Sequence, residues 1–319
     1  MASTTAVAVD LALISGSVAA LWLGAERLVG SATRIAQRLG VSDLVIGLSV
    51  VAIGTSAPEF AVTVDAALTG RADIAVGNVV GSNLFNLGFI LGGVAMTSVT
   101  VAAAPEVIRR DGTVLVGGSL LVLGFLRDLE LARWEGAVLV GLLVAYLVYL
   151  FVSEQSLKQE TRDRREFRRR DVALLLVGLG LVVGGGRLLV GSAADLARAA
   201  GLSEWVIGVT VVAAGTSTPE LATSVVAARR GSAGVTVGNL IGSDLFNLLG
   251  VLGLAAIIRP PTVASTAIQG LLWVTALVLV ALAMLWSEGE LTRPEGALLV
   301  GIAAVRWALD LAGLGPSVP

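Results

Sequence analysis

The chain contains no cysteine and no histidine among its 319 residues. The missing cysteines exclude disulfides and thiol chemistry, and the missing histidines exclude imidazole catalysis and zinc sites built on histidine. Charged residues are also scarce, at 14% of the chain against about 25% in soluble domains. The formal net charge is only -2. No bulk field therefore points to nucleic acid or to another strongly charged partner.

Apolar residues dominate instead. They make up 55% of the chain, and the mean hydropathy is +0.89. A soluble core cannot bury so much apolar surface, so the composition predicts a membrane protein. The first residues carry no basic leader and run directly into an apolar stretch. We therefore expect a first membrane span at this end and not a cleaved signal.

Apolar runs of about 20 residues, the length that a helix needs to cross about 30 Å of hydrocarbon, predict about ten spans. The fourth run is the shortest. The predicted spans are 8–28, 43–68, 74–97, 112–127, 134–152, 172–190, 204–228, 236–258, 266–286 and 294–313.

A single long polar stretch, residues 153–171, separates the fifth run from the sixth. Its basic residues are Lys158, Arg162, Arg164, Arg165, Arg168, Arg169 and Arg170. The positive-inside rule predicts that this linker is cytoplasmic, so with five spans on each side both termini face outward. Arg109, Arg110, Arg229 and Arg230 then lie inside as well. We interpret the arginine cluster as a topology determinant and not as a lipid-binding site.

The chain is an internal repeat. Residues 45–92 align without gaps on residues 206–253, at an offset of 161 residues, so that IGTSAPEF matches AGTSTPEL. A second match, ELARWEGAVLVG with ELTRPEGALLVG, follows at an offset of 160 residues. The chain therefore divides into a first five-helix unit, 1–152, the linker, and a second unit, 172–319.

Five is an odd number, so the second unit must enter the membrane from the opposite side. This inverted repeat is typical of secondary transporters, whose sites lie near the midplane between the two halves. Glu59 and Glu220 occupy equivalent positions in the two units. We expect them to meet at one site.

The sequence around each glutamate predicts a broken helix. Pro58 and Pro219 have no N–H to donate, so the carbonyls of Gly54 and Gly215 lose their helical partners. Freed carbonyls are cation ligands. The same turns carry four hydroxyl groups, on Thr55, Ser56, Thr216 and Ser217.

The following helix of each unit adds more oxygen atoms. GNVVGSNLFN places Ser82 and Asn86 four residues apart, and GNLIGSDLFN places Ser243 and Asn247 likewise, so each pair lies on one helix face. Carboxylate, hydroxyl, amide and carbonyl oxygens, without nitrogen or sulfur ligands, suit hard cations such as Ca²⁺ or Na⁺.

A structural role explains the small and polar residues when each is taken singly, because Gly, Ser and Asn commonly pack membrane helices together. A glutamate at mid-bilayer is different, since it is costly unless it is paired, protonated or metal-bound. The nearest basic residues within spans, Arg27 and Arg187, lie toward helix ends, where we interpret them as reaching for the interface. Two glutamates in matching broken helices therefore indicate ion binding.

GTSAPE with GNVVGSNLFN, and GTSTPE with GNLIGSDLFN, resemble the two signature repeats of the calcium/cation antiporter superfamily, closest in style to prokaryotic sodium/calcium exchangers. The resemblance covers nearly the whole chain. It implies an all-α membrane fold of ten helices in two inverted halves. It also implies alternating access, in which Na⁺ flowing down its gradient drives Ca²⁺ the other way.

The resemblance also implies a ligand set. Glu59 and Glu220 would be the central Ca²⁺ ligands, shared with Na⁺, and Asn86 and Asn247 would line the centre of the cluster. The flanking Na⁺ sites would use Thr55, Ser56, Ser82, Thr216, Ser217 and Ser243 with the carbonyls of Ala52 and Ala213. We expect Ca²⁺, Na⁺ and the lipid bilayer as partners, in a cell inner (plasma) membrane. We expect no cofactor, no enzymatic reaction and no obligatory protein partner.

Two departures from the family pattern leave alternatives open. Some relatives carry aspartate where this chain has Asn86 or Asn247, so this site holds fewer carboxylates. Asp244 stands where its repeat mate is Asn83, either near the site or on a helix face along a water-filled path. The coupling ion could thus be Na⁺, H⁺ or K⁺.

Two other functions fit the sequence less well. A channel would need an ion filter, and the sequence shows no evident oligomeric filter. An intramembrane hydrolase would need two carboxylates in unlike settings, whereas the two glutamates here lie in near copies of one setting. The linker is too short for a calcium-sensing domain.

Overall fold

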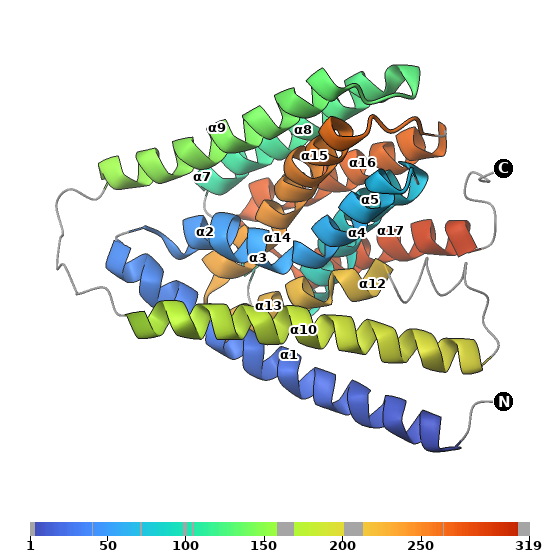
Figure 1. Ribbon diagram of the computed structural model, residues 1–319. Helices are drawn as coiled ribbons and strands as arrows, with labels where there is room; N and C mark the ends of the chain where they lie inside the picture. Colours follow the sequence, from blue (N-terminus) through green and yellow to red (C-terminus); the bar gives the residue numbers. More distant parts are fainter. Residues whose placement is uncertain are drawn as a thin grey trace.

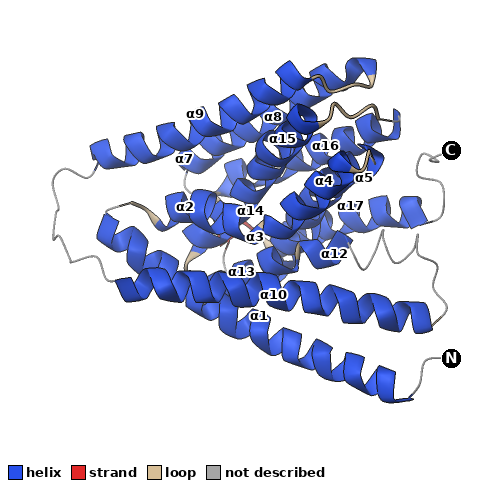
Figure 2. Cartoon of the chain, viewed as in Figure 1, coloured by secondary structure: helices blue, strands red, loops and turns tan. Residues whose placement is uncertain are grey.

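The computed structural model describes residues 4–39, 41–70, 72–97, 101–103, 105–157, 169–200, 213–263 and 265–311. Almost all of these residues are helical (Figures 1 and 2). The helices form ten successive stretches, five before and five after the linker, several of which contain a short π-helical segment (η).

The first repeat consists of α1 (Thr4–Leu39), a broken helix, two helices with π-helical segments, and α9 (Arg133–Leu157). The broken helix comprises α2 (Asp43–Ile46), η1 (Gly47–Val51), α3 (Ala52–Thr55) and α4 (Ala57–Leu68). The next comprises α5 (Ala72–Leu84), η2 (Phe85–Leu91) and α6 (Gly92–Met96). The fourth comprises α7 (Pro105–Val107), η3 (Ile108–Gly112), α8 (Thr113–Phe125) and a 3₁₀ turn, η4 (Leu126–Asp128).

The second repeat follows the same order. It consists of α10 (Arg169–Ala199), α12 (Ala213–Thr216) with α13 (Thr218–Arg229), α14 (Ala233–Leu245) with η6 (Phe246–Val251) and α15 (Leu252–Ile258), α16 (Ser265–Glu288) and α17 (Arg293–Leu311). Two short strands, β1 (Val101–Ala102) and β2 (Glu290–Leu291), pair antiparallel. Residues 204–212 of the predicted seventh span, and Lys158 to Arg168 of the linker, lie outside the described residues.

The ten stretches follow the predicted spans in order, but not all of them qualify as membrane spans on their own. Six described helices are long and apolar enough, or seven if the bent pair Leu44–Thr55 and Ala57–Leu68 counts as one. The other three stretches are 105–128, 213–229 and 293–311. The first and third carry charged residues, and the second is described only from residue 213.

The first helices of the two repeats pack antiparallel, side by side along one edge of the bundle (Figure 1). A Cβ added at Gly24 would touch Gly178 and Leu181, whereas one added at Gly185 would touch Leu21. Later positions on α1 therefore meet earlier positions on α10. Toward the linker, Arg34 and Arg38 of α1 both pair with Asp171 of α10.

Close helix contacts occur in equivalent pairs, as an inverted repeat requires. A Cβ at Gly92 would lie 2.7 Å from the carbonyl oxygen of Gly296, and one at Gly136 would lie 2.5 Å from that of Gly253. Only glycine permits such an approach. The first contact joins α6 to α17 and the second joins α9 to α15, so each repeat's third helix packs on the other repeat's fifth. The predicted inverted architecture is confirmed.

The helices that carry the GN motifs lie at the centre of the molecule. In the most apolar stretches of 74–96 and 233–258, 67% and 72% of residues are buried. The corresponding shares are 17% in α1 and 28% in both α9 and α10, whose remaining faces are exposed. Polar side chains on the central helices are thereby shielded from both lipid and water.

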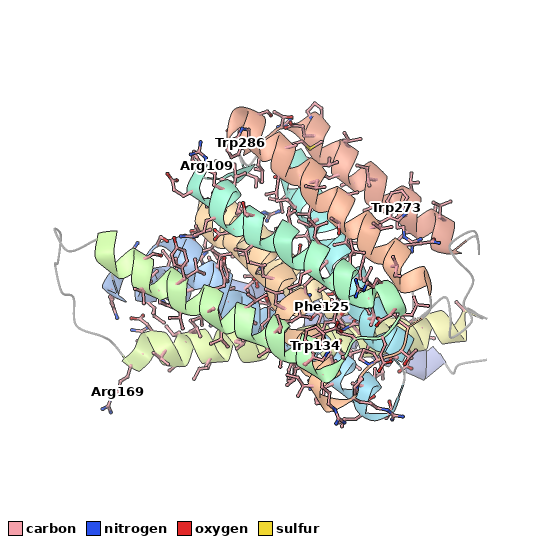
Figure 3. All side chains as sticks on the ribbon, turned by 90° about the horizontal axis from the view of Figure 1, so that it is seen from above. Arg109, Phe125, Trp134, Arg169, Trp273 and Trp286 are labelled. Carbon is pink, nitrogen blue, oxygen red and sulfur yellow. The ribbon has the colours of Figure 1, made fainter. Side chains whose placement is uncertain are left out.

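The fourth span begins at Pro105, earlier than predicted, because the buried carboxylate of Asp111 is paired inside the protein. Asp111 is fully buried, forms an ion pair with Arg110, and accepts a 2.9 Å hydrogen bond from the hydroxyl of Tyr146. Near the helix ends, the Arg109 guanidinium lies over the ring of Trp286 at 5.0 Å, and Phe125 packs edge-on against Trp134 (Figure 3). Such aromatic residues are typical of membrane interfaces.

Candidate cation-binding site

Both signature prolines follow a helix break, as predicted. In the first repeat, Ser56 separates α3 from α4 with φ -78° and ψ 12°, and the two helical pieces meet at 49°. In the second repeat, Ser217 separates α12 from α13 with φ -87° and ψ 9°. A proline occupies the first turn of the following helix in each case, where its missing N–H costs no helical bond. The two breaks place the next glutamate in the first helical turn.

The breaks bring Glu59 and Glu220 together across the repeats. Both side chains are fully buried. The hydroxyl of Ser56 donates to Oε1 of Glu220 at 2.9 Å, and the hydroxyl of Ser217 donates to Oε1 of Glu59 at 3.1 Å. Each broken helix thus holds the carboxylate of the other repeat. The sequence predicted that the two motifs would meet. The two reciprocal hydrogen bonds show that they do.

The central helices hold the same two oxygens from their own repeat. Ser82 of α5 donates to Oε1 of Glu59 at 3.4 Å, and Ser243 of α14 donates to Oε1 of Glu220 at 3.2 Å. Both Oε1 atoms therefore accept two hydrogen bonds from serine hydroxyls. Because all four serine hydroxyls donate to Oε1 atoms, the Oε2 atom of each carboxylate is left for another ligand.

Two asparagines that the sequence analysis did not single out donate hydrogen bonds to the main-chain carbonyls of the two glutamates. Asn78 donates from Nδ2 to the main-chain carbonyl of Glu59 at 3.1 Å and to Thr63 at 3.0 Å. Asn239 does the same to the carbonyl of Glu220 at 3.5 Å and to the hydroxyl of Ser224 at 3.1 Å. The signal was present in the sequence, since these residues are the repeated Asn of both GN motifs.

A second polar cluster lies where the central helices of the two repeats meet. Asn86 donates from Nδ2 to Oδ1 of Asp244 at 3.0 Å, and Asn247 donates from Nδ2 to Oδ1 of Asn83 at 3.1 Å. All four side chains are fully buried. Asn86 and Asn247 are the second residues of η2 and η6, and π-helical turns often mark functional sites. Asp244 therefore belongs to the site and not to an exposed helix face.

Several buried oxygens of these residues have no hydrogen-bond partner. They are Oε2 of Glu59, Oε2 of Glu220, Oδ1 of Asn86, Oδ1 of Asn247 and Oδ2 of Asp244. Buried polar atoms are normally satisfied, so five orphaned acceptors in one site indicate a missing donor or cation. Within the described part of the chain, no arginine or lysine pairs with either glutamate.

The donor set consists of carboxylate, amide and hydroxyl oxygens. Among the described residues, no group of three or more His, Cys, Asp or Glu side chains could hold a metal ion. Any cation must therefore be held by at most two carboxylates, with neutral oxygens completing its shell. Such a shell suits Na⁺ and Ca²⁺ better than a transition metal.

The remaining predicted ligands differ in their surroundings and in the hydrogen bonds that they make. The carbonyl of Ala52 already accepts hydrogen bonds from the N–H of Ser56 at 3.0 Å and the hydroxyl of Thr55 at 3.3 Å. The single proton of the Thr55 hydroxyl is shared between this carbonyl and Oδ1 of Asn239, which lies at 3.1 Å. Ala213 is the first described residue of its helix. Thr216 is buried at the end of that helix and lines a cavity.

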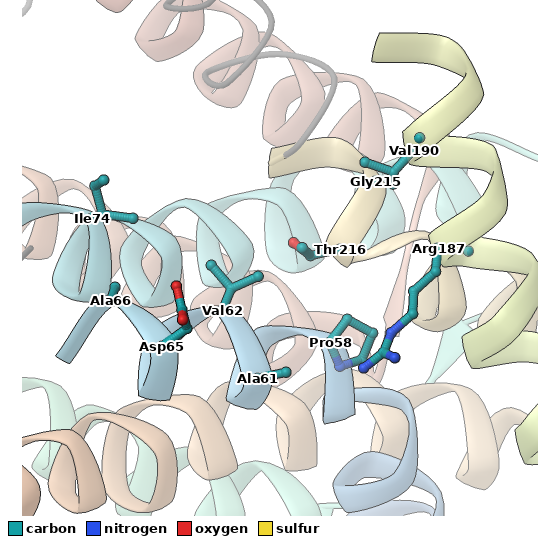
Figure 4. Close-up of a pocket in the computed structure, with 12 residues that line it drawn as sticks. Pro58, Ala61, Val62, Asp65, Ala66, Ile74, Arg187, Val190, Gly215 and Thr216 are labelled. Atoms are coloured by element: carbon teal, nitrogen blue, oxygen red, sulfur yellow. The ribbon is translucent and has the colours of Figure 1, made fainter. Parts of the chain in front are cut away.

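This cavity, of about 540 Å³, lies between α4, α10 and α12 (Figure 4). Its walls include Pro58 and Thr216, which neighbour the glutamate site along the chain, with Asp65 and Arg187 as its charged residues. Most of the lining is apolar, from residues such as Val62. Arg187 is exposed, as expected for a side chain that reaches toward an interface. The cavity therefore lies beside both broken helices, which carry the two glutamates.

Comparison with known proteins places the chain among ion exchangers. A model of the family described as sodium/calcium exchanger protein matches residues 9–152 and 171–308. The sodium/calcium exchanger MaX1 of Methanosarcina acetivorans is 31% identical, over 87% of this chain and 91% of its own length. The inner membrane protein YrbG of Escherichia coli is 34% identical, over 92% of this chain and 93% of its own.

Solved structures of the sodium–calcium exchanger NCX_Mj have the same fold. The structure from a crystal soaked without Na⁺ and Ca²⁺ superposes with a TM-score of 0.83 at 26% identity, covering 97% of this chain and 99% of the other. The structure soaked with 10 mM Na⁺ and 10 mM Sr²⁺ gives a TM-score of 0.84, also at 26% identity.

Proposed function

The chain belongs to the sodium/calcium exchanger protein family, and we propose that it is a secondary antiporter that exchanges Na⁺ for Ca²⁺ across a membrane by alternating access. The observation that carries this proposal is the pair of fully buried carboxylates, Glu59 and Glu220, each with one oxygen unpartnered. Neither has a basic partner among the described residues. Cations taken from solution would balance both charges.

We propose that Glu59 and Glu220 bind Ca²⁺ through their free Oε2 atoms. Asn86 and Asn247 would add their free amide oxygens at the centre of the cluster. Thr55, Ser56, Ser82, Thr216, Ser217, Ser243 and the carbonyls of Ala52 and Ala213 would serve the flanking Na⁺ ions. Because Ca²⁺ and Na⁺ compete for the same two carboxylates, one ion must leave before the other binds. Exchange is then the natural cycle of this site.

The position of the cavity supports alternating access. The protein is a multi-pass membrane protein, and the arginine-rich linker supports a cytoplasmic position for the start of α10. The cavity touches α10 at Gly186 to Gly191, more than halfway along the helix, so it would open outward. Ion binding shifts such a protein only by favouring one conformation over the other. The long antiparallel pair α1 and α10 would move as the site opens to the other side.

We infer a cell inner membrane location from the likeness to YrbG, an inner membrane protein. Na⁺ and Ca²⁺ are the substrates, and the family is one of transporters. Transport of this kind changes no covalent bond, so the site needs no catalytic group and no cofactor.

The proposal is tested by ⁴⁵Ca²⁺ uptake into proteoliposomes loaded with Na⁺, with K⁺-loaded and acid-loaded vesicles as gradient controls. We expect uptake only with internal Na⁺, and a loss of at least about a hundredfold in the Glu59→Gln variant, because a buried ligand charge is removed. The matched control is Glu106→Gln, a glutamate exposed at the start of α7. Uptake driven only by the acid interior, or full exchange by Glu59→Gln, would contradict the proposal.

A further inference from the structure

The two repeats differ in charge at one buried position of the site. Asn83 in the first repeat corresponds to Asp244 in the second, and both side chains are fully buried. The neighbouring ligand positions are conserved between the repeats as Ser82 with Ser243 and Asn86 with Asn247. The acid at position 244 therefore adds a carboxylate that the first repeat lacks at the equivalent position.

Asp244 and Asn83 each accept a hydrogen bond from an asparagine of the other repeat. Oδ1 of Asp244 accepts from Nδ2 of Asn86 at 3.0 Å, and Oδ1 of Asn83 accepts from Nδ2 of Asn247 at 3.1 Å. Asn83 is itself fixed, because its Nδ2 donates to the main-chain carbonyl of Asp244 at 3.2 Å. The contacts form one connected network across the interface of the repeats.

This network fixes the orientation of each central amide. An asparagine amide has a donor end, Nδ2, and an acceptor end, Oδ1. A carboxylate can only accept, so Asp244 holds the donor end of Asn86. The acceptor ends of Asn86 and Asn247 are the atoms left buried without a partner. Were either amide turned over, an N–H group would face the cations in place of an oxygen.

We propose that Asp244 and Asn83 are positioning residues that orient the amides of Asn86 and Asn247, so that both amide oxygens point into the ion site. This inference rests on the proposed function, since it assumes that the site binds Ca²⁺. Asp244 acts through Asn86, and Asn83 acts through Asn247. Neither residue needs to touch the ion.

The test is a double-mutant cycle on equilibrium ⁴⁵Ca²⁺ binding to the purified protein in detergent, which requires no transport. Asp244→Ala should weaken Ca²⁺ binding about tenfold, the order expected when one ligand oxygen is misplaced. In an Asn86→Ala background there is no amide to orient, so the same substitution should then change the affinity less than about twofold.

A second arm uses Asn83→Ala with and without Asn247→Ala, and the same loss of effect is expected. This arm decides the question if Asp244→Ala does not yield folded protein, as judged by size-exclusion chromatography and thermal unfolding. Tenfold weakening in both backgrounds would overturn the proposal, because Asp244 would then act as a direct ligand or through the fold alone. Unchanged affinity in both Asp244→Ala and Asn83→Ala would also overturn it. Absence of Ca²⁺ binding by the unmodified protein would instead sink the proposed function.

Discussion

The two broken helices carry the same groups to the site but meet different surroundings. On the α4 side, the cavity of about 540 Å³ separates α4 from α10. On the α13 side, Arg230 at the end of α13 reaches α1, where its guanidinium lies 3.7 Å from Glu26 and closes over Gly30. The hydrogen bonds of the site are thus symmetric, whereas the packing around the two broken helices is not. One inverted fold can hold its two glutamates by matching hydrogen bonds from both halves while a cavity lies beside α4.

The largest effect tests the symmetry of the ligands. Glu220→Gln should abolish Na⁺-driven Ca²⁺ uptake as completely as Glu59→Gln, by at least about a hundredfold, because each carboxylate is buried and shared between repeats. The double variant should be no worse than either single one, since the pair acts as a unit. Uptake assays on the three variants at matched protein density measure this. A single variant that keeps a tenth or more of the activity would show that one carboxylate dominates.

The second effect tests the asymmetry of access. The chain has no cysteine, so a single introduced thiol is unique. Val62 lines the cavity, whereas its repeat mate Thr223 is fully buried. In detergent, Val62→Cys should react with a charged thiol reagent about tenfold faster than Thr223→Cys, because reactivity requires exposure.

Mass spectrometry of the labelled protein follows this reaction, and labelling after denaturation gives the total for each variant. The unmodified chain, which has no thiol, sets the background. Equal rates at the two positions would mean that the described asymmetry is absent in solution.

The smallest effect compares the two reciprocal hydrogen bonds. Ser56→Ala and Ser217→Ala each remove one donor to the opposite glutamate, at 2.9 Å and 3.1 Å. Each should weaken Ca²⁺ binding about fivefold, the value of one hydrogen bond of about 1 kcal/mol. Equilibrium ⁴⁵Ca²⁺ binding measures the change.

Ser119→Ala is the matched control, because this buried serine donates only to the carbonyl of Leu115 in its own helix, at 2.9 Å. It should leave Ca²⁺ binding unchanged. Losses that differ more than about threefold between Ser56→Ala and Ser217→Ala would break the symmetry of the ligand set.

Much of the fold could be predicted because apolar runs and repeats are visible directly in the sequence. Apolar runs located the helical stretches, and the gap-free repeat predicted the inverted architecture. The fourth span was predicted as residues 112–127, shorter than the observed 105–128, and the difference has a physical cause. Charged residues normally end an apolar run, but Asp111 forms an ion pair with Arg110 inside the protein and accepts a hydrogen bond from Tyr146. Nothing in the local sequence announces that partner, because Tyr146 belongs to another helix.

The site was predicted in its residue types but not in its connections. Glu59 and Glu220 stand out because an acid in an apolar run has few explanations. Asn78 and Asn239 do not stand out, because a single asparagine in a membrane helix usually serves packing. Their role as supports of the glutamate carbonyls depends on distances of 3.1 and 3.5 Å between helices.

The sequence by itself determined the membrane setting, the two copies of one unit, the breaks at Pro58 and Pro219, and the all-oxygen character of the site. Each of these follows from composition, spacing or the chemistry of single residues. Only the tertiary structure decided that each broken helix holds the other repeat's glutamate, that Asp244 lies inside the site, and that the cavity opens beside α4. These features depend on how helices far apart in the chain pack together, and no local pattern encodes the distance between them.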